Sequence, residues 1–469
     1  MAKKYEDFGE WYLETCDKAK LCDKRYPIKG MNVWTPYGWR IMKDIDGFIR
    51  KYLDETGHDE VNFPLLIPET EFKKEKDHIK GFDEEVYWVT HAGLNPLDVR
   101  LVLRPTSETA MYPMFSLWVR SHADLPLKIY QIVNTFRYET KQTRAFMRVR
   151  EIHFFESHTC HADREDAERQ VAQDVEIVDN ICNAICLPYS LLVRTDWDKF
   201  PGADYTVGID TVMPNGRTLQ IGSAHYYGTN FSKPYNITYE EEGGTHEYVH
   251  QTTLGMSERL LGAVIGTHAD DEGLILPPAI SPVQIVIIPI FKKDNADEVL
   301  TYCRALEEVL KKAGIRAKLD DSDARPGAKF FDWEVKGVPL RFEIGGRDLE
   351  NKVISFARRD NGDKGTIDAD SVVDGARLLF KQIASDMKEK AARQREGFID
   401  DMPTMDGVES IPEGRIVRIG WCGCPECGHA FEDKYDIKIL GTPYHPDGKS
   451  PNCIVCGKPG KTAYAARTM

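Results

Sequence analysis

Length, composition and charge limit the classes of protein that this sequence can encode. The chain has 469 residues, and at roughly 150 residues per domain this length predicts about three domains. Its formal net charge of −14 argues against a broad nucleic-acid surface, because phosphate contacts need Lys and Arg, although a basic local face can sit on an acidic whole. No apolar run reaches about 18 residues, and the first residues lack the apolar stretch of a signal peptide. We therefore expect a cytoplasmic protein with no membrane partner.

The first predicted domain covers residues 1–278 and alternates helices with strands. Apolar residues on one helical face predict a helix that ends near Gly57: Ile41, Ile45, Phe48, Ile49 and Tyr52. A strand-like run from Val61 to Ile67 follows. Because Pro64 cannot donate to a ladder, we expect an edge or interface strand.

A second amphipathic helix is predicted further along this domain. Its apolar residues recur every three or four positions: Ala167, Val171, Val175, Val178, Ile181 and Ile185.

A proline-rich boundary separates the first domain from a second. Pro277, Pro278 and Pro282 precede an almost wholly apolar run that begins at Val283, typical of a strand buried on both faces. Helices near 298–313 and 330–335 then alternate with strands near 316–319 and 340–344. This order predicts a small α/β domain over residues 283–390. Residues 388–414 are polar and charged, so we expect a loop-like linker before a last domain at 411–469.

Two stretches of the first domain carry residues suited to binding phosphate. The familiar nucleotide motifs, the G-x-x-x-x-G-K-[ST] loop and the G-x-G-x-x-G fingerprint, are missing. However, Phe136-Arg-Tyr-Glu139 is followed by a basic loop and then by Arg148, which predicts a strand, a turn and a returning strand. Arg137 and Arg148 are suited to hold a phosphate or carboxylate in a bidentate fork. Taken alone, such a segment is more often a surface hairpin with Arg–Glu pairs.

The second stretch begins at Gly255 and runs into an apolar helix. Gly255 would let the backbone pass close to a flat ligand, Ser257 would cap the helix, and Arg259 would project from its first turn. An ordinary capped core helix with one solvated Arg is the competing interpretation.

Together these stretches, with the helix and strand around Pro64 before them, resemble the three signature motifs of class II aminoacyl-tRNA synthetases. The class I signatures are absent. The resemblance implies an α+β fold in which an antiparallel sheet is flanked by helices. It also implies a homodimer, because the first motif builds the dimer interface in that class.

Further segments narrow the resemblance to the prolyl-tRNA synthetases of the archaeal and eukaryotic type. They begin at Arg104, Phe154 and Gln220 and read Arg-Pro-Thr-Ser-Glu-Thr, Phe-Phe-Glu-Ser-His and Gln-Ile-Gly-Ser-Ala-His. The resemblance covers essentially the whole chain. It implies that the protein activates L-proline with ATP and Mg²⁺ and transfers it to tRNA(Pro). The alternatives are a sister enzyme for threonine, serine, glycine or histidine, and a catalytically silent paralogue.

The resemblance also implies a proline pocket, and the residues suit it. Proline offers two N–H donors, a carboxylate and a small apolar ring, so its pocket needs an anion, a neutral acceptor and an apolar wall. Glu108 would supply the anion, Thr106 the acceptor and Phe154 the wall. The remaining predicted proline contacts are Glu156, His158, His225 and Arg137. Taken alone, Thr106-Ser-Glu108 is more often the start of a helix with a first-turn acid.

The ATP contacts are likewise carried over from the family, by position. They fall on Arg137, Glu139, Arg148, Gln220, Ser223, Ser257 and Arg259. Arg137 and Arg259 are the predicted catalytic residues. The second domain resembles the family's anticodon-binding domain, where we expect Glu343 and Arg347 to contact tRNA because base edges are read by carboxylates and Arg.

The last domain has a cysteine pattern that predicts a structural zinc site. Cys453 and Cys456 form one pair, and Cys422, Cys424 and Cys427 offer three residues for two further places. Four thiolates in two short loops suit tetrahedral Zn²⁺. Spacing alone favours Cys424 with Cys427, whereas the family's spacing favours Cys422 with Cys427. We expect Cys422, Cys427, Cys453 and Cys456 to be the ligands. The family usually ends in a tyrosine, and this chain ends in Met469, so no role of that tyrosine is carried over.

Overall fold

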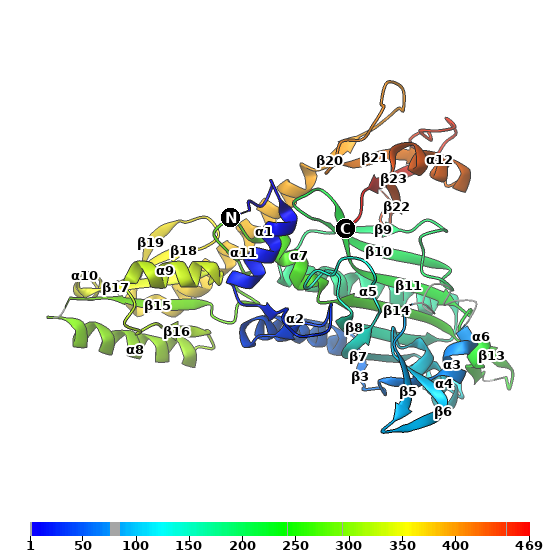
Figure 1. Ribbon diagram of the computed structural model, residues 1–469, viewed down its shortest axis with the longest axis horizontal. Coiled ribbons are helices and arrows are strands. Elements are labelled where there is room, and N and C mark those ends of the chain that lie inside the picture. Colours follow the sequence, from blue (N-terminus) through cyan, green and yellow to red (C-terminus); the bar gives the residue numbers. More distant parts are fainter. Residues whose placement is uncertain (1, 76–84, 242, 293, 447) are drawn as a thin grey trace.

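A large, mostly antiparallel sheet forms the centre of the protein (Figure 1). The computed structural model describes every residue except 1, 76–84, 242, 293 and 447. The sheet contains eleven strands in the following order: β20 (Ile399–Asp401), β21 (Ile416–Trp421), β23 (Lys461–Ala466), β22 (Lys438–Pro443), β9 (Ser190–Val193), β10 (Tyr205–Val212), β11 (Thr218–Gly228), β14 (His250–Ser257), β8 (Glu151–His161), β7 (Leu127–Phe136) and β3 (Asp59–Glu60). The run from β9 to β7 is antiparallel throughout, and β7 and β8 are the predicted strand and its return.

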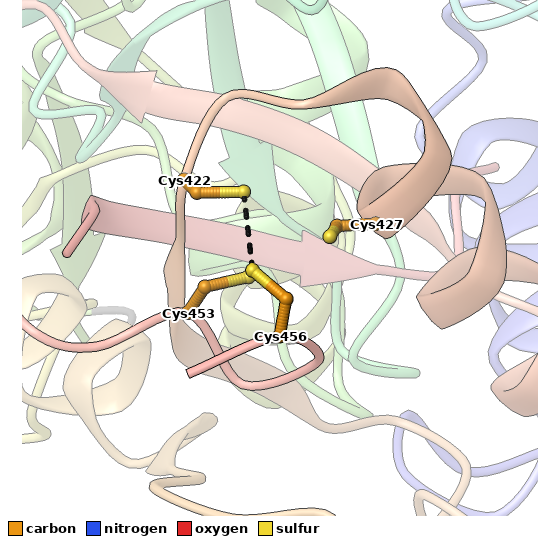
Figure 2. Close-up of side chains that lie close together, drawn as sticks. All are labelled: Cys422, Cys427, Cys453 and Cys456. Atoms are coloured by element: carbon orange, nitrogen blue, oxygen red, sulfur yellow. Dashed lines mark hydrogen bonds between the residues drawn. The ribbon is translucent and has the colours of Figure 1, made fainter. Parts of the chain in front are cut away.

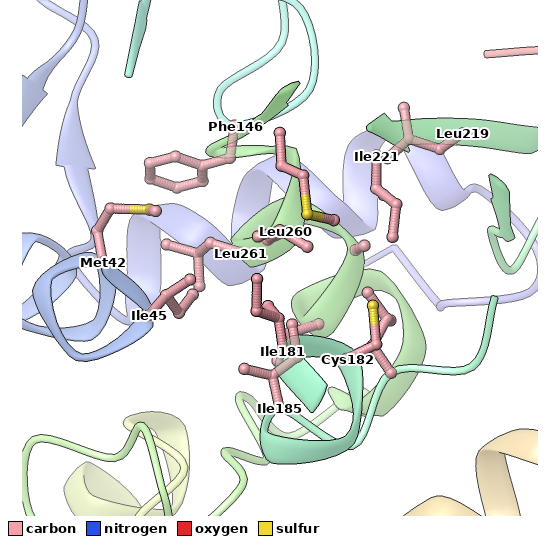
Figure 3. Packing of buried hydrophobic residues seen from close by; sticks show 14 of the residues in the cluster. Met42, Ile45, Phe146, Ile181, Cys182, Ile185, Leu219, Ile221, Leu260 and Leu261 are labelled. Atoms are coloured by element: carbon pink, nitrogen blue, oxygen red, sulfur yellow. The ribbon is translucent and has the colours of Figure 1, made fainter. Parts of the chain in front are cut away.

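Helices cover one face of this sheet and enclose the main apolar core (Figure 3). They are α1 (Phe8–Lys18), α2 (Pro36–Glu55), α5 (Arg164–Ala184) and α7 (Arg259–His268). Figure 3 shows Ile45 of α2, Ile181 of α5 and Leu261 of α7 packed together. Helices α2 and α5 form where the periodic apolar residues predicted them, so both predictions are confirmed. Ile41, Ile45 and Ile49 of α2 are buried, whereas Phe48 and Tyr52 pack against the core only partly buried. All six residues that predicted α5 are buried.

The strand predicted around Pro64 is wrong over residues 61–65. Strand pairing occurs only at β3 and at β4 (Leu66–Pro68), and the residues between them are extended without a ladder. Val61 still donates its N–H to the carbonyl oxygen of Tyr130 at 2.8 Å, so the segment follows β7 for one residue beyond β3. Pro64 has no N–H to continue that pairing.

A smaller three-stranded sheet stands beside these segments. Its order is β4, β6 (Asn95–Leu103) and β5 (Trp88–Ala92). It lies against α3 (Glu69–Phe72) and near α4 (Glu108–Trp118). This unit places the start of α4, with Glu108, beside the large sheet.

The second domain is the predicted α/β unit, with an antiparallel extension. Its sheet has the order β16 (Ala317–Leu319), β15 (Ile285–Ile290), β17 (Leu340–Gly345), β18 (Val353–Arg358) and β19 (Lys364–Asp368). Parallel pairing joins the first three strands. Its helices are α8 (Ala296–Lys312), α9 (Pro326–Val335), α10 (Gly346–Asn351) and α11 (Val372–Glu396). Figure 1 shows this domain at the end of the molecule away from α12.

The loop predicted for residues 388–414 is partly wrong. Helix α11 continues to Glu396, and β20 follows at Ile399–Asp401. The helix buries Leu379, Ile383, Met387 and Ala391, spaced four residues apart. From Lys388 to Glu396 the only apolar residues are Ala391 and Ala392, and the charged residues around them gave this part of the segment the composition of a linker.

The C-terminal domain is joined directly to the large sheet. Strand β22 pairs with β9 through Thr442 and Val193, and α12 (Pro425–Tyr435) packs beside these strands. In the part of the chain that the structure describes, no helix is long and apolar enough to cross a membrane.

Candidate active site

A cavity of about 340 Å³ opens over strands β8, β11 and β14, on the side of the sheet away from the helices. Alternation along the strands explains this, because Phe155 and Leu254 point into the helical core while their neighbours Phe154 and Gly255 line the cavity. Ten of the predicted site residues line it: Thr106, Glu108, Arg137, Phe154, Glu156, Gln220, Ser223, His225, Ser257 and Arg259. The structure therefore brings together segments more than a hundred residues apart.

Glu108 is held at the first turn of α4 by two hydroxyl donors. Thr106 Oγ1 donates to Glu108 Oε2 at 2.5 Å, and Tyr227 OH donates to Oε1 at 2.8 Å. The side chain is only 3% exposed, yet it lines the cavity. Ser107 occupies the helix N-cap without a side-chain capping bond, because its Oγ donates to Glu156 instead. The carboxylate is therefore fixed in place with its charge facing a ligand space.

Glu156 lines the cavity and is bonded to the buried side chain of His158 behind it. His158 Nε2 lies 3.2 Å from Glu156 Oε2, and its Nδ1 lies 3.1 Å from Tyr112 OH. Burial acts to lower the pKa of His158, but the bond to Glu156 and the charge of Glu108 outweigh burial and raise it. His158 does not line the cavity, so its predicted contact with a ligand has no support in this geometry.

His225 is a neutral polar group in the pocket wall. Its Nδ1 lies 2.8 Å from Thr206 Oγ1, and its Nε2 lies 2.9 Å from Ser223 Oγ. Burial lowers its pKa to about 3, and the positive charges of His158 and Arg194 act in the same direction. A neutral imidazole offers one donor and one acceptor, so these two hydroxyls fix the orientation of the ring.

Arg137 and Arg259 place two guanidinium groups at the same cavity. Arg259 donates from Nε to the carbonyl oxygen of Met147 at 2.8 Å and from Nη1 to that of Gln220 at 3.0 Å. Burial and the charges of Arg137 and Arg148 lower its pKa to about 10, so it remains charged at neutral pH. Arg137 donates from Nε to the carbonyl oxygen of Pro105 at 3.2 Å. Clustered like charges of this kind are suited to an anion between them.

Arg148 and Glu139 lie beside this cavity and not in its wall. Arg148 Nε is 3.6 Å from Glu139 Oε2, and Arg148 Nη2 donates to the main-chain oxygen of Met469 at 3.0 Å. Arg148 and Met469 line an adjoining cavity of about 530 Å³. It shares four lining residues with the first cavity: Arg194, Asp198, Gln220 and Arg259. The two cavities together give room for a ligand longer than an amino acid.

The segment from Gly255 to Arg259 differs from the prediction in one respect. Helix α7 begins at Arg259 with Glu258 as its N-cap, and Ser257 is the last residue of β14. The predicted capping role of Ser257 is therefore wrong in register, although its Oγ accepts the N–H of Arg259 at 3.3 Å. A Cβ at Gly255 would lie 2.8 Å from the Phe154 ring, so glycine makes room for that aromatic wall.

A further pocket wall was not predicted from the sequence. It is the 194–201 segment between β9 and β10, of which Arg194, Asp198, Lys199, Phe200 and Pro201 line the cavity. The Phe200 ring centroid lies 4.8 Å from that of His225. The segment has no periodic pattern, and only the aromatic and charged composition of Asp-Trp-Asp-Lys-Phe hinted at a role.

Four cysteines of the C-terminal domain converge as predicted (Figure 2). The Sγ atoms of Cys422, Cys427, Cys453 and Cys456 all lie within 4.8 Å of one another, and Cys422 and Cys456 are 3.8 Å apart. Cys424 is not in this group; its Sγ lies 2.5 Å from Glu426 Oε2. Burial acts to raise the pKa of Cys453, but backbone N–H groups of Cys456 and Val455 lower it to about 6.

The two residues predicted to contact an anticodon lie near one end of β17. Glu343 is in the strand and accepts from Arg341 Nε at 2.9 Å. Arg347 is exposed in α10. Their role stays a prediction.

Family models match each of the three parts of the chain. Residues 87–268 match the tRNA synthetase class II core domain for G, H, P, S and T. Residues 284–377 match an anticodon-binding domain, and residues 405–468 match the C-terminal domain of prolyl-tRNA synthetase.

Individual relatives match along the whole length. The proline–tRNA ligase of Thermococcus kodakarensis is 56% identical over 473 aligned positions, with 99% of this chain and 98% of the relative covered. The ligase of Methanosarcina mazei is 53% identical, with 99% and 97% covered.

Solved structures agree with these relatives. The Giardia lamblia prolyl-tRNA synthetase, in complex with prolyl-adenylate, superposes with a TM-score of 0.96 at 36% identity and covers 100% of this chain and 99% of its own. The Cryptosporidium parvum enzyme, complexed with halofuginone and AMPPNP, superposes with a TM-score of 0.95 at 33% identity. This match covers 100% of this chain and 99% of the Cryptosporidium chain. With the cavity and its charged residues, these matches exclude the sister enzymes as the family of this chain: it belongs to the archaeal and eukaryotic type of prolyl-tRNA synthetase, the class II enzymes that ligate proline to tRNA.

Proposed function

We propose that the cavity over β8, β11 and β14 binds proline and ATP together and joins them as prolyl-adenylate. The observation that carries this is the pairing of one buried carboxylate, Glu108, with the guanidinium groups of Arg137 and Arg259 in a single cavity. An amino acid has a cationic end and an anionic end, and this arrangement matches both. The prolyl-adenylate in the Giardia structure and the AMPPNP in the Cryptosporidium structure support the same ligands here.

The proline end of the proposed complex lies at Glu108. Its carboxylate would accept one N–H of the secondary ammonium, and Thr106 would accept the other. Phe154 would wall the ring on one side and Phe200 on another. His225 is neutral and held by two hydroxyls, so it would add a polar contact without a charge that repels the ammonium.

Activation would then proceed by positioning and charge stabilisation. The proline carboxylate attacks the α-phosphorus of ATP in line and expels pyrophosphate. Arg137 would hold that carboxylate against the α-phosphate and stabilise the charge that develops on phosphorus. Arg259 and Arg148 would hold the β- and γ-phosphates, with Gln220, Ser223, Ser257 and Glu139 as further ATP contacts. Mg²⁺ fits this end because it takes carboxylate and phosphate oxygens; bound with ATP, it would neutralise phosphate charge.

In the second half-reaction, the terminal ribose hydroxyl of tRNA(Pro) attacks the prolyl carbonyl and releases AMP. Among the described residues that line the cavity, none is an evident general base. His225 is a weak base, because burial lowers its pKa to about 3, and Glu108 would be occupied by proline. The other two carboxylates are already paired, Glu156 with His158 and Asp198 with Lys438. A phosphate oxygen of the adenylate would take the proton. The test is aminoacylation of a tRNA(Pro) transcript: charging should need proline and ATP, and a transcript of another tRNA should remain uncharged. Charging of both alike would contradict the proposal. Contacts of Glu343 and Arg347 with the anticodon belong to this proposal.

We also propose that the four-cysteine cluster holds a structural Zn²⁺. A Zn–S distance of about 2.3 Å in a tetrahedron places the sulfurs about 3.8 Å apart, and Cys422 and Cys456 stand at 3.8 Å. Four thiolates leave no open position for substrate, so the ion would fold the domain and take no part in the reaction.

A pair of variants tests the ligand assignment. We expect Cys422→Ser to lower bound zinc well below one ion per chain and to lower the thermal midpoint, because metal binding contributes folding free energy. Cys424→Ser is the matched control and should keep the zinc content and the thermal midpoint of the parent protein. Elemental analysis of purified protein measures the metal, and the opposite ranking of the two variants would show that Cys424 is the ligand.

A homodimer through the region around Pro64 is a further proposal. Five large apolar side chains there expose between 36% and 54% of their surface: Leu65, Leu66, Met114, Leu117 and Trp118. The Phe63 ring lies 5.6 Å from that of Trp118 and links the segment to α4. Contiguous exposed apolar surface of this kind marks an interface.

Sedimentation of the intact protein tests this proposal. We expect a dimer, and we expect Leu117→Glu to shift it toward monomer. Leu94→Glu is the matched control, since Leu94 is 97% exposed on the β5–β6 hairpin and lies outside this apolar surface. A monomeric parent protein, or equal effects of the two variants, would contradict the proposal.

A further inference from the structure

An aromatic side chain of the 194–201 wall of the cavity packs into the C-terminal domain. Trp197 lies between the pocket-lining residues Arg194 and Asp198, but its ring points into the C-terminal domain and packs against the apolar cluster that contains Cys427 and Phe431. We propose that Trp197 is a positioning residue for proline binding, which fixes the pocket wall against helix α12. The proposal rests on the proposed role of the cavity.

Helix α12 is shaped to receive this indole. Trp197 Nε1 donates to both carboxylate oxygens of Glu432, at 3.1 and 3.3 Å, and the ring centroid lies 4.3 Å from that of His429. A Cβ at Gly428 would lie 2.3 Å from the indole, so only glycine leaves this space. Trp421 contacts the ring edge on, at 5.8 Å between centroids. The indole is therefore held by contacts on several sides and by a directed hydrogen bond.

A tight turn joins the indole to the residues that line the pocket. The N–H groups of Asp198 and Lys199 both donate to the carbonyl oxygen of Thr195, so Trp197 lies within this turn. Phe200 follows, and its N–H donates to Thr206 Oγ1 at 3.0 Å. That hydroxyl contacts His225. A shift of the indole would therefore move Phe200 and the hydroxyl that orients His225.

Two polar contacts also join the 194–201 wall to the C-terminal domain. Lys438 Nζ lies 3.0 Å from Asp198 Oδ1, and Arg194 Nη1 donates to the carbonyl oxygen of Leu440 at 2.8 Å. Arg194 is also paired with Asp210 at 2.6 and 2.8 Å, so it is fixed from within the catalytic sheet. The Lys438 pair is exposed and contributes little. Trp197 is the aromatic contact that holds residues 198–201 against the C-terminal domain.

The arrangement predicts a selective defect in proline binding. Lys199, Phe200 and Pro201 line the first cavity and not the adjoining one, whereas Asp198 lines both. The arginines proposed for ATP are held by the main-chain oxygens of Met147, Gln220 and Pro105, outside this wall. Loss of the indole should therefore impair proline binding and leave ATP binding nearly intact.

The test compares the Michaelis constants for proline and ATP in proline-dependent ATP–pyrophosphate exchange. We expect Trp197→Ala to raise KM for proline about tenfold or more, since small misplacements of positioning groups have large effects, with KM for ATP within about twofold. Trp197→Phe keeps the ring and loses the donor, so it should fall between Trp197→Ala and the parent. The matched control is Trp333→Ala, because Trp333 is a buried tryptophan of the second domain whose Nε1 also donates to a carboxylate, Asp320, at 2.8 Å.

Each outcome decides the inference. It is overturned if the Trp197 variants keep the parent's KM for proline, if both Michaelis constants rise together, or if Trp333→Ala gives the same defect. Metal content is measured on every variant, and a defect that follows metal loss alone would also overturn it. If Trp197→Ala does not fold, Trp197→Phe carries the same test. Absence of proline-dependent exchange in the parent protein would instead refute the proposed function.

Discussion

Replacement of Arg137 by alanine should lower the rate of prolyl-adenylate formation about 1000-fold, the scale of losing one preorganised charge-stabilising group. Arg137 lines the cavity together with Glu108 and Arg259. Burial acts to lower its pKa, and the nearest carboxylates, led by Glu108, oppose that effect. Its guanidinium would meet the charge that develops on the α-phosphate. Single-turnover adenylate formation measures the effect directly.

Two variants make the Arg137 result interpretable. Arg137→Lys keeps the charge but loses the planar fork, so we expect only partial recovery. Arg100→Ala removes an exposed arginine of β6, which pairs with Glu69 of α3. This variant should form prolyl-adenylate at the rate of the parent protein. Near-normal adenylate formation in folded Arg137→Ala would refute the catalytic role of this residue.

The second large effect is expected at Glu108. Glu108→Gln keeps the shape of the side chain and removes its charge, so the ammonium of proline would lose its buried counter-ion. Loss of one partner of a buried hydrogen-bonded charge pair costs about 2–5 kcal/mol. We therefore expect KM for proline to rise about 100-fold, with a much smaller change in KM for ATP.

A matched substitution controls for the loss of a carboxylate from the same region. Glu151 lies at the start of β8 and accepts from Asn134 Nδ2 at 2.8 Å, outside the cavity lining. Glu151→Gln should leave KM for proline and KM for ATP near those of the parent protein. Equal rises in KM for proline and for ATP in Glu108→Gln would show that Glu108 supports the whole cavity and does not recognise proline specifically.

Local patterns in the sequence were sufficient to predict two of the helices that enclose the main core, whereas α1 was not predicted. The spacing of Ile41, Ile45 and Ile49 predicts α2, and the longer series from Ala167 predicts α5, because each helix buries one continuous face. The same logic failed for the end of α11, where the residues after Met387 are mostly charged and lie outside the apolar core of the α/β domain. The prediction of a strand around Pro64 also failed, because residues 61–65 have the composition of a strand but form no ladder with a neighbouring strand.

The candidate site was predictable through the family resemblance, because the same segments taken alone favour an ordinary hairpin and ordinary helix starts. Glu108, Arg137 and Arg259 were predicted in this way, and all three line the cavity. His158 belongs to the same motif as Phe154 and Glu156, but its side chain lies behind the wall and pairs with Glu156. Trp197 was missed because its role depends on a domain more than two hundred residues later, and no local pattern encodes that contact. Phe200 was missed because its segment has no periodic pattern, although it contacts His225 of the same domain.

The most direct test of the central claim is ATP–pyrophosphate exchange without tRNA, with each of the twenty amino acids in turn. The cavity predicts exchange that depends on proline, with weaker signals only from other small amino acids, which a small pocket rejects poorly. Stronger exchange with threonine, serine, glycine or histidine than with proline, in folded and zinc-loaded protein, would contradict the account.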